Sequence, residues 1–409
     1  MNNQRETILY VSTSAQHYQG AGGRTRIINL IKYSRENNFN IILLCFLPLK
    51  QFFNLNILTN SKKILKKDSN SKVVYFPKIP TKIFMKSESY LGFYYSNIIN
   101  KISNQYSIGI IHAHGHSAAR MSLFAKEKNK KLKLITDSHG VSPEEVSYEN
   151  PMVDTKYIQY ITETESYVIN NTDWNIFVSN AMKRHYSNKY AYKKSNYTVI
   201  PCATDLQPEP VLKDLRFLRE EYGLKNRIVF CYVGSIRKYQ LVKETLDVFI
   251  EIKKQFDSAY LMILSSHVEN FNKLILEKSI PKKDFLVMSV SQKDVNKFTT
   301  IADFGFLLRD KSTVNVVSSP TKFAEYLMSG VPVITTNYVG DYSLLVDKKD
   351  IGLIIDIDKI DKTSLNKFIN RIMKNRNKFR SMCYEECMTN LTWESNGIKI
   401  IDIYLNLSK

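Results

Sequence analysis

The fold is decided by the stretch VVSSPTKFAEYLMSGVPVITT, residues 316–336. A helix is predicted over Thr321–Met328, because Ser319 is a favourable N-cap and Pro320 a favourable first helical residue. A glycine and a proline then end the helix, and a short apolar strand is predicted over Val333–Thr335. A helix that leads directly into an apolar strand is typical of a parallel-sheet unit.

Apolar strand patterns alternate with amphipathic helix patterns along the rest of the chain, as in βαβ units. The strands predicted in the first half are Ile8–Val11, Ile41–Cys45, Val73–Phe76, Ile108–His112, Leu132–Thr136, Trp174–Val178 and Thr198–Pro201. Those in the second half are Ile228–Val233, Tyr260–Ile263, Phe285–Met288, Phe304–Leu308, Val333–Thr335 and Gly352–Ile355. Helices between them include Arg24–Glu36, Leu241–Lys254, Lys293–Ile301 and Thr321–Met328. Two such series predict an α/β protein of two doubly wound, Rossmann-like domains.

The boundary between the two domains is expected near Pro201–Lys213, where a polar loop separates a strand from a new helix, Asp214–Tyr222. A last helix is predicted over Trp393–Leu407, because its apolar residues recur at helical spacing. With 409 residues, the chain is long enough for two domains of about 200 residues each.

The composition excludes several classes of protein. The five cysteines are scattered and odd in number, which argues against a disulfide framework and fits a reducing cytosol. Because no apolar stretch is long enough for a signal peptide or a membrane span, a cytoplasmic protein is expected. The net charge of +19 indicates an anionic partner, for which nucleic acid, anionic lipid and phosphorylated substrates all qualify. The lysines lack the aromatic motifs of RNA-binding modules, which argues against nucleic acid.

The helix over Thr321–Met328 is the strongest candidate for a ligand site. Its first N–H groups, after Ser319 and from Thr321 onward, have no partner within the helix, and Lys322 adds a positive charge. An anion is therefore expected there. Glu325, one turn later, can accept hydrogen bonds from two neighbouring hydroxyls such as those of a ribose. The alternative is a well-capped structural helix with Glu325 as a surface charge.

A glycine-rich loop after the first strand is a second candidate. Gly22 and Gly23 would let backbone N–H groups approach a phosphate. Arg24 and Arg26 follow in the first helical turn, where a cation is unfavourable unless an anion binds beside it. The alternative is a flexible turn between a strand and a helix.

A third candidate opens the second domain. Gly234 follows a strand, and Arg237 and Lys238 follow the glycine, an arrangement that suits a diphosphate. In a chain with so many lysines, the alternative is a solvated basic turn.

Histidines follow two neighbouring strands. His112, His114 and His116 lie at the end of one, and His139 at the end of the next, at the edge where parallel sheets bind ligands. No carboxylate or cysteine stands at ligand spacing, so no metal site is predicted. The role preferred for His116 is a hydrogen-bonded cap, whereas His139, before a glycine, can point into a cleft.

Six segments, in one order, resemble the retaining GT-B glycosyltransferases (glycosyltransferase family 4-like, group 1). Residues 319–336 resemble the signature region of that family, and residues 232–240 (YVGSIRKYQ) its strand–glycine–cation loop. The other matching segments are VIPCATDL (199–206), NIFVSNAMKRHY (175–186), IIHAHGH with TDSHG (110–116 and 136–140), and TWES (392–395).

The resemblance implies two Rossmann-like domains that face a cleft. Residues 1–205 would form the acceptor-side domain and residues 206–390 the domain that binds the nucleotide-sugar donor. Residues 391–409 would form a closing helix that packs back on the N-terminal domain.

The resemblance also implies roles in the donor domain. Glu325 would bind the donor ribose. Arg237 or Lys238, together with Lys322, would meet the diphosphate and stabilise the charge that develops on the leaving group.

In the N-terminal domain, the backbone of Gly22 and Gly23 would approach the same phosphates, and His139 would contact the donor sugar near its 6-position. Two positions depart from the family pattern. Val317 stands where the first signature glutamate is usual, and Ser235 stands where an arginine is common. An unusual donor, or the subgroup with a Ser-Pro-x-Lys turn, would account for Val317.

The activity implied is transfer of a hexosyl or N-acetylhexosaminyl group to a glycan or lipid-linked acceptor, without a bound metal or other cofactor. Such enzymes build bacterial surface polysaccharides such as capsule or lipopolysaccharide. Three alternatives stay open: a GT-B enzyme of other chemistry (a nucleotide-sugar epimerase or polyol-phosphate transferase), an inactive GT-B scaffold, and a nucleic-acid-binding protein.

A basic stretch between Lys50 and Lys86 contains nine lysines and one acidic residue, Asp68, with apolar and aromatic residues between them. Cations beside aromatic side chains suit the surface of an anionic membrane. A peripheral position on the inner face of the plasma membrane is therefore expected; the alternative is a solvated insertion with an ordinary core.

Overall fold

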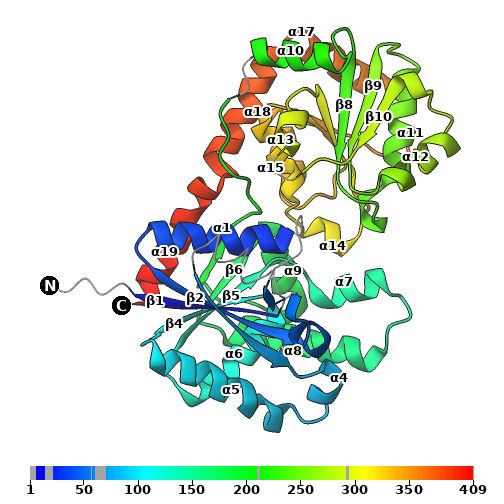
Figure 1. Cartoon of the computed structure of the whole chain (residues 1–409). Helices are drawn as coiled ribbons and strands as arrows, with labels where there is room; N and C mark the ends of the chain where they lie inside the picture. Colours follow the sequence, from blue (N-terminus) through cyan, green and yellow to red (C-terminus); the bar gives the residue numbers. More distant parts are fainter. Residues whose placement is uncertain are drawn as a thin grey trace. The chain divides into compact units, whose positions relative to one another are not determined.

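The computed structural model describes residues 6–13, 22–56, 58–59, 71–209, 212–291 and 294–408. These residues form two compact units (Figure 1). The first unit comprises Met1–Pro201 together with Asn396–Lys409, and the second comprises Cys202–Ser395. Among the described residues, no helix combines the length and the apolar character needed to cross a membrane.

The first unit contains a seven-stranded sheet in the order β3-β2-β1-β4-β5-β6-β7, in which every neighbouring pair is parallel. Its strands are β1 (Thr7–Ser12), β2 (Asn40–Pro48), β3 (Lys72–Lys78), β4 (Ile110–His114), β5 (Lys133–Ser138), β6 (Trp174–Phe177) and β7 (Tyr197–Val199). The central strands bury almost every side chain, because helices cover both faces of the sheet.

The helices of this unit are α1 (Gly22–Glu36), α2 (Leu49–Phe52), α4 (Thr81–Phe84), α5 (Glu88–Gln105), α6 (His116–Lys128), α7 (Ser142–Glu149), α8 (Thr155–Asn171) and α9 (Asn180–Tyr190). Figure 1 shows α5, α6 and α8 on one face of the sheet and α1 on the other. The last helix, α19 (Trp393–Leu407), contributes Tyr404, whose hydroxyl lies 2.6 Å from that of Tyr10 on β1.

The second unit contains a six-stranded parallel sheet in the order β10-β9-β8-β11-β12-β13. Its strands are β8 (Ile228–Val233), β9 (Ala259–Leu264), β10 (Phe285–Met288), β11 (Phe304–Leu307), β12 (Val333–Thr335) and β13 (Gly352–Ile354). Its helices are α10 (Leu212–Glu221), α11 (Val242–Lys253), α12 (Val268–Glu277), α13 (Val295–Thr299), α14 (Thr313–Val316), α15 (Thr321–Met328), α16 (Tyr342–Lys349), α17 (Lys362–Lys374) and α18 (Arg376–Asn390), with 3₁₀ turns at Lys238–Gln240 and Lys282–Asp284.

The α/β fold class with two parallel sheets is confirmed, and every strand predicted from the sequence is present with its ends shifted by at most a few residues. The largest change for the site concerns β4, which ends at His114 rather than His112. His116 therefore begins α6 and does not cap a strand.

Candidate active site

A tight turn after β8 lies at the carboxyl edge of the second sheet. Gly234 follows the strand with φ of 134°, a value that side chains rarely allow. A Cβ atom there would come 2.5 Å from Cε of Lys322 and would overlap its ammonium. Glycine is therefore required for Lys322 to lie against this turn.

Lys322 is the second residue of α15, and its ammonium donates a hydrogen bond to Oε1 of Gln240. The ammonium also lies 4.6 Å from the centroid of the Tyr232 ring. Burial, and then the charge of Arg309, hold the pKa of Lys322 well below its usual range. A neighbouring anion would restore the full charge of this lysine.

Arg309 follows β11 and is only 4% exposed. Its Nη1 donates to the carbonyl of Tyr239 at 3.3 Å, and the guanidinium lies 5.1 Å from the Tyr239 ring centroid. The hydroxyl of Thr336 fixes the backbone of Arg309, accepting from its N–H at 3.0 Å and donating to its carbonyl at 2.7 Å. The sequence assigns no role to Arg309; an arginine directly after a buried strand is the signal that identifies it.

Arg309 and Lys322 together determine which kind of ligand this edge of the sheet can hold. In the described part of the chain, neither side chain forms a salt bridge with a carboxylate. A buried cation beside a half-buried one, without a paired carboxylate, is unfavourable unless an anion binds to them. The arrangement can hold a phosphate or diphosphate.

Arg237 and Lys238, predicted to meet the diphosphate, are both exposed on the turn that precedes α11. They come from the same loop as Gly234. The structure adds Arg309 to this edge as the better-buried cation.

The start of α15 differs from the prediction in one respect. Ser319 is not its N-cap: the cap position is Pro320, and no side chain caps the helix. The Ser319 hydroxyl is buried and accepts from the N–H of Cys202 at 2.8 Å, and it lies 2.7 Å from the hydroxyl of Tyr342. The serine therefore forms its hydrogen bonds to residues that are remote in sequence, and not to the N–H groups at the start of α15.

The rest of α15 agrees with its predicted geometry. The helix begins at Thr321 and provides no internal partner for the N–H groups of Thr321 and Lys322. Glu325 lies one turn beyond them, is half-buried, and its charge raises the pKa of Lys322. Val317, at the position of the usual first glutamate, is 2% exposed. A carboxylate at that position would be buried in the unit.

The first unit carries a buried polar cluster at the corresponding edge of its sheet. Arg26 on α1 forms hydrogen bonds to both oxygens of Asp137 on β5, at 2.8 Å from Nε to Oδ2 and from Nη2 to Oδ1. Its Nη1 donates to the carbonyls of Ile200 and Pro201 at 3.0 and 3.2 Å. The anion beside Arg26 is thus the Asp137 carboxylate of the same unit.

His114 lies 3.2 Å from Asp137 through Nδ1, and the His112 ring stacks on it at 4.7 Å. Burial raises the pKa of Asp137, but Arg26 and His114 outweigh burial and hold that pKa well below its usual range. Burial lowers the pKa of His112 well below its usual range, so this ring is neutral. His112, His114 and Asp137 have ligand atoms within 4.8 Å of one another, the arrangement of a possible metal site. Because the Arg26 guanidinium already binds both carboxylate oxygens, we interpret the cluster as a buried ion pair.

His116 is held in a second polar network. Its Nδ1 lies 3.2 Å from Oε1 of Glu165, and its Nε2 lies 3.0 Å from the hydroxyl of Ser138. Glu165 in turn accepts from the N–H of Ser142 at 3.0 Å and from the hydroxyl of Tyr190 at 2.8 Å. This network fixes the turn from Ser138 to Ser142.

His139 lies on that turn and is exposed, at the carboxyl edge of the first sheet. Gly22 and Gly23 begin α1 together with Arg24. Residues 14–21 of the predicted phosphate loop, and the side chain of Arg24, lie outside what the structure describes.

Comparison with known proteins finds a matching family model for each unit. A family model described as Glycosyl transferases group 1 matches residues 215–387, and one described as Glycosyltransferase Family 4 matches residues 20–208. No curated protein matches the chain in sequence.

Solved structures similar over the whole chain include HepE of Anabaena in complex with UDP, at 13% identity and a TM-score of 0.71, covering 98% of this chain and 100% of that one. A glycosyltransferase from Rickettsia africae ESF-5 is 16% identical with a TM-score of 0.71 and 99% coverage of each chain. The lipopolysaccharide outer core galactosyltransferase WaaB is 12% identical with a TM-score of 0.67, covering 98% of this chain and 99% of that one. The fold is that of GT-B glycosyltransferases.

Proposed function

We propose, from the premise that each half of this chain is a glycosyltransferase domain, that the protein transfers a sugar from a nucleoside-diphosphate sugar to a hydroxyl group. The observation that carries the proposal is the pair of cations Arg309, which is buried, and Lys322, which is half-buried, beside the start of α15. A diphosphate supplies the charge and the acceptor oxygens that this pair requires. Since HepE is described in complex with UDP and with UDP-glucose, a uridine-diphosphate sugar is the first donor to test.

The chemistry follows from where charge develops. When the bond from the sugar to the diphosphate breaks, negative charge grows on the leaving oxygen, and we propose that Lys322 and Arg309 stabilise it. The departing phosphate can accept the proton of the acceptor hydroxyl on the same face of the sugar, which retains the anomeric configuration. Neither a protein nucleophile nor a metal is needed for this route.

A direct test measures release of the nucleoside diphosphate with and without glycan acceptors, together with thermal shifts in a panel of nucleotide sugars. A bound donor at 100 times its Kd should stabilise the protein by about 2.7 kcal/mol. Nucleotide release that needs no acceptor and yields an isomerised sugar would instead indicate an epimerase. No thermal shift with any donor would contradict the proposal.

The acceptor is proposed to be a glycan or lipid-linked saccharide of a bacterial surface polysaccharide. The similarity in fold to WaaB, described as a lipopolysaccharide outer core galactosyltransferase, supports this class. An isotope-labelled sugar should therefore be transferred into a lipid-extractable product when membranes are added.

Peripheral attachment to an anionic membrane is part of the proposal. In the first unit, Phe53, Leu55 and Tyr90 are 75%, 74% and 82% exposed, which is unusual for large apolar side chains. Exposed lysines of the basic stretch between Lys50 and Lys86 include these two residues and Lys72. Of the predicted basic stretch, Lys62, Lys63, Lys66, Lys67 and the side chain of Lys82 lie outside the described residues.

Sedimentation with vesicles tests this attachment. Binding to anionic vesicles should fall with salt, and it should weaken in a variant with Phe53, Leu55 and Tyr90 changed to serine. A control variant, Phe217→Ser, removes an aromatic residue that is 70% exposed from the second unit and should bind as the parent does. Binding to neutral and anionic vesicles alike would exclude an electrostatic attachment.

A further inference from the structure

A cavity of ≈ 150 Å³ lies in the first unit, among α5, α6, α7, α8 and the end of β3. His116 at the start of α6 and Ser142 at the start of α7 both line it. Because β4 and β5 lead into these helices, the cavity lies at the carboxyl edge of the sheet, the edge to which His139 belongs.

Lys78, the last residue of β3, brings a positive charge to the wall of this cavity. Its side chain is half-buried, and burial lowers its pKa. Within the described part of the chain, the Lys78 ammonium has no hydrogen-bond or salt-bridge partner. A lysine in this position is stabilised by an anion in the cavity.

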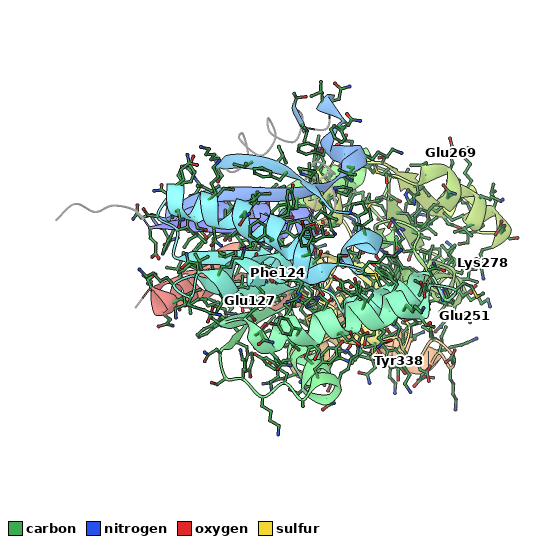
Figure 2. All side chains as sticks on the ribbon, turned by 90° about the horizontal axis from the view of Figure 1, so that it is seen from below. Phe124, Glu127, Glu251, Glu269, Lys278 and Tyr338 are labelled. Carbon is green, nitrogen blue, oxygen red and sulfur yellow. The ribbon has the colours of Figure 1, made fainter. Side chains whose placement is uncertain are left out.

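Arg120, in the second turn of α6, brings a second positive charge. Its Nε donates to Oε1 of Glu88 at 2.6 Å, and its guanidinium lies 4.4 Å from the ring centroids of both Phe124 and Tyr167. Figure 2 labels Phe124 on this helix, with Glu127 one turn further along. Nη1 of Arg120 is buried without a hydrogen-bond partner among the described residues, since Glu127 lies 4.0 Å away.

Two cations, Lys78 and Arg120, line the cavity, and no carboxylate of the described residues lines it. The carboxylates near Arg120 lie outside the lining: Glu88 accepts from its Nε, and Glu127 lies 4.0 Å from its Nη1. Glu165, whose Oε1 lies 3.2 Å from Nδ1 of His116, does not line the cavity either. Its oxygens are occupied by Ser142 N–H and the Tyr190 hydroxyl. The Lys78 ammonium and the buried Nη1 of Arg120 remain available as donors to a ligand.

The size and the lining of the cavity define the rest of that ligand. A space on the order of 150 Å³ accommodates about one six-membered ring. Tyr95, Tyr157 and Tyr160, which carry aromatic rings, line the cavity, and so do Ser117 and Thr164, which carry hydroxyl groups. Aromatic faces beside hydroxyls suit a sugar ring, which has apolar C–H faces and polar edges.

We propose that this cavity binds one sugar ring that carries a negatively charged group, a carboxylate or a phosphoryl group, with the anion at Lys78 and Arg120. This inference rests on the proposed function, because the ring would be the end of the acceptor glycan. The hydroxyl that receives the new sugar would then lie at the edge of the sheet to which His139 belongs.

Isothermal titration of the full chain with glucuronate, glucose 6-phosphate, glucose and inorganic phosphate tests the proposal. The two charged sugars should bind, and Lys78→Met should weaken both by about 10-fold or more, the value of a lost charge-assisted hydrogen bond. The matched control is Lys72→Met, which removes an exposed lysine from the other end of the same strand and should change neither affinity. Val146→Phe, which fills the cavity from α7, should abolish binding even if Lys78→Met does not fold.

Each other result has a definite meaning. Equal affinity for glucose and the charged sugars, or no effect of either cavity variant, would overturn the proposal. Inorganic phosphate bound as tightly as glucose 6-phosphate would overturn the assignment of a ring. Thermal shifts with nucleotide sugars report on the second unit, so their absence beside intact binding of charged sugars would contradict the proposed function alone.

Discussion

The Lys322 ammonium and the side-chain amide of Gln240 are joined by a hydrogen bond, and the same amide oxygen accepts from the Tyr232 hydroxyl at 2.5 Å. The partners of this ammonium, on a half-buried side chain, are thus a neutral amide and an aromatic ring. Neutral groups hold the side chain in place without cancelling its charge. Lys322 is therefore positioned for an anionic ligand before that ligand arrives, which is the arrangement that electrostatic catalysis requires.

Replacing Lys322 with alanine should lower kcat on the order of 10²-fold with a smaller change in donor affinity, because the leaving-group charge develops fully only in the transition state. Steady-state kinetics with the donor found by thermal shift provides the measurement. Lys311→Ala, at an exposed lysine in the loop before α14, should be near the parent rate. A kcat unchanged in Lys322→Ala would remove this residue from the reaction.

Arg309→Ala should reduce kcat/KM more than Arg237→Ala. Arg309 is 4% exposed and Arg237 is exposed, so the charge of Arg309 is less screened by water. A loss on the order of 10²-fold is expected for each arginine that contacts the diphosphate. If Arg237→Ala and Lys238→Ala are the damaging variants and Arg309→Ala is silent, the diphosphate binds at the exposed turn.

Glu325→Ala should raise the KM for the donor strongly, by an amount equivalent to about 2–3 kcal/mol, because a charged acceptor for two ribose hydroxyls is lost. Glu325→Gln keeps the shape and should lose less. Donors with ribose and 2′-deoxyribose offer an independent measurement: their difference in KM should disappear in Glu325→Ala. A persistent difference would assign the ribose to another residue.

Gly234→Ala should impair the enzyme without unfolding it. The added Cβ would lie 2.5 Å from Cε of Lys322, and the lysine must move because the turn backbone is fixed by the hydrogen bond from Gly234 N–H to the carbonyl of Leu264 at 2.9 Å. The φ of 134° adds strain of about 1–3 kcal/mol. We expect a kcat loss similar to that of Lys322→Ala, measured together with thermal unfolding; full activity would mean that the lysine position is not critical.

Glu165 should make the free energy of unfolding depend on pH. Burial raises the pKa of this carboxyl to about 7, and the charge of Glu144 adds to the effect. Between about pH 4.5 and 7 the unfolded chain has released this proton while the folded protein retains it, so Glu165 lowers stability as pH rises. His116, whose pKa burial lowers to about 4, acts in the opposite direction below about pH 6.5.

Glu165→Gln removes only the first of these two contributions. The stability of this variant relative to the parent should rise by about 1.4 kcal/mol per pH unit between pH 5 and 7, measured by urea unfolding across that range. A difference that is constant with pH would mean that Glu165 ionises at its ordinary pKa in the folded protein.

The strands and most helices were predictable because their signals are local. Ile228–Val233 is an unbroken apolar run, and Thr321–Met328 lies between a proline and a glycine; the structure has both elements at those residues. The spacing of apolar residues along the chain predicts which side chains are buried. Because the strands of each sheet are parallel, the residues that follow them meet at one edge of that sheet. The sequence could therefore identify His139, Gly234 and Lys322 as candidates.

Pairings between distant residues were decided only by the tertiary structure. Ser319 has the chemistry of an N-cap, yet its hydroxyl accepts from the N–H of Cys202 and lies 2.7 Å from the Tyr342 hydroxyl, because packing brings these groups within hydrogen-bond distance. Arg26 was compatible with a ligand phosphate until the order β1-β4-β5 placed Asp137 beside it. The sequence by itself determined which segments are strands and helices and which residue types stand at the sheet edges. The assembled sheets decided which charges cancel, as in Arg26 with Asp137, and which stay available, as in Lys322 and Lys78, because the electrostatic energy of a side chain depends on neighbours that are distant in sequence.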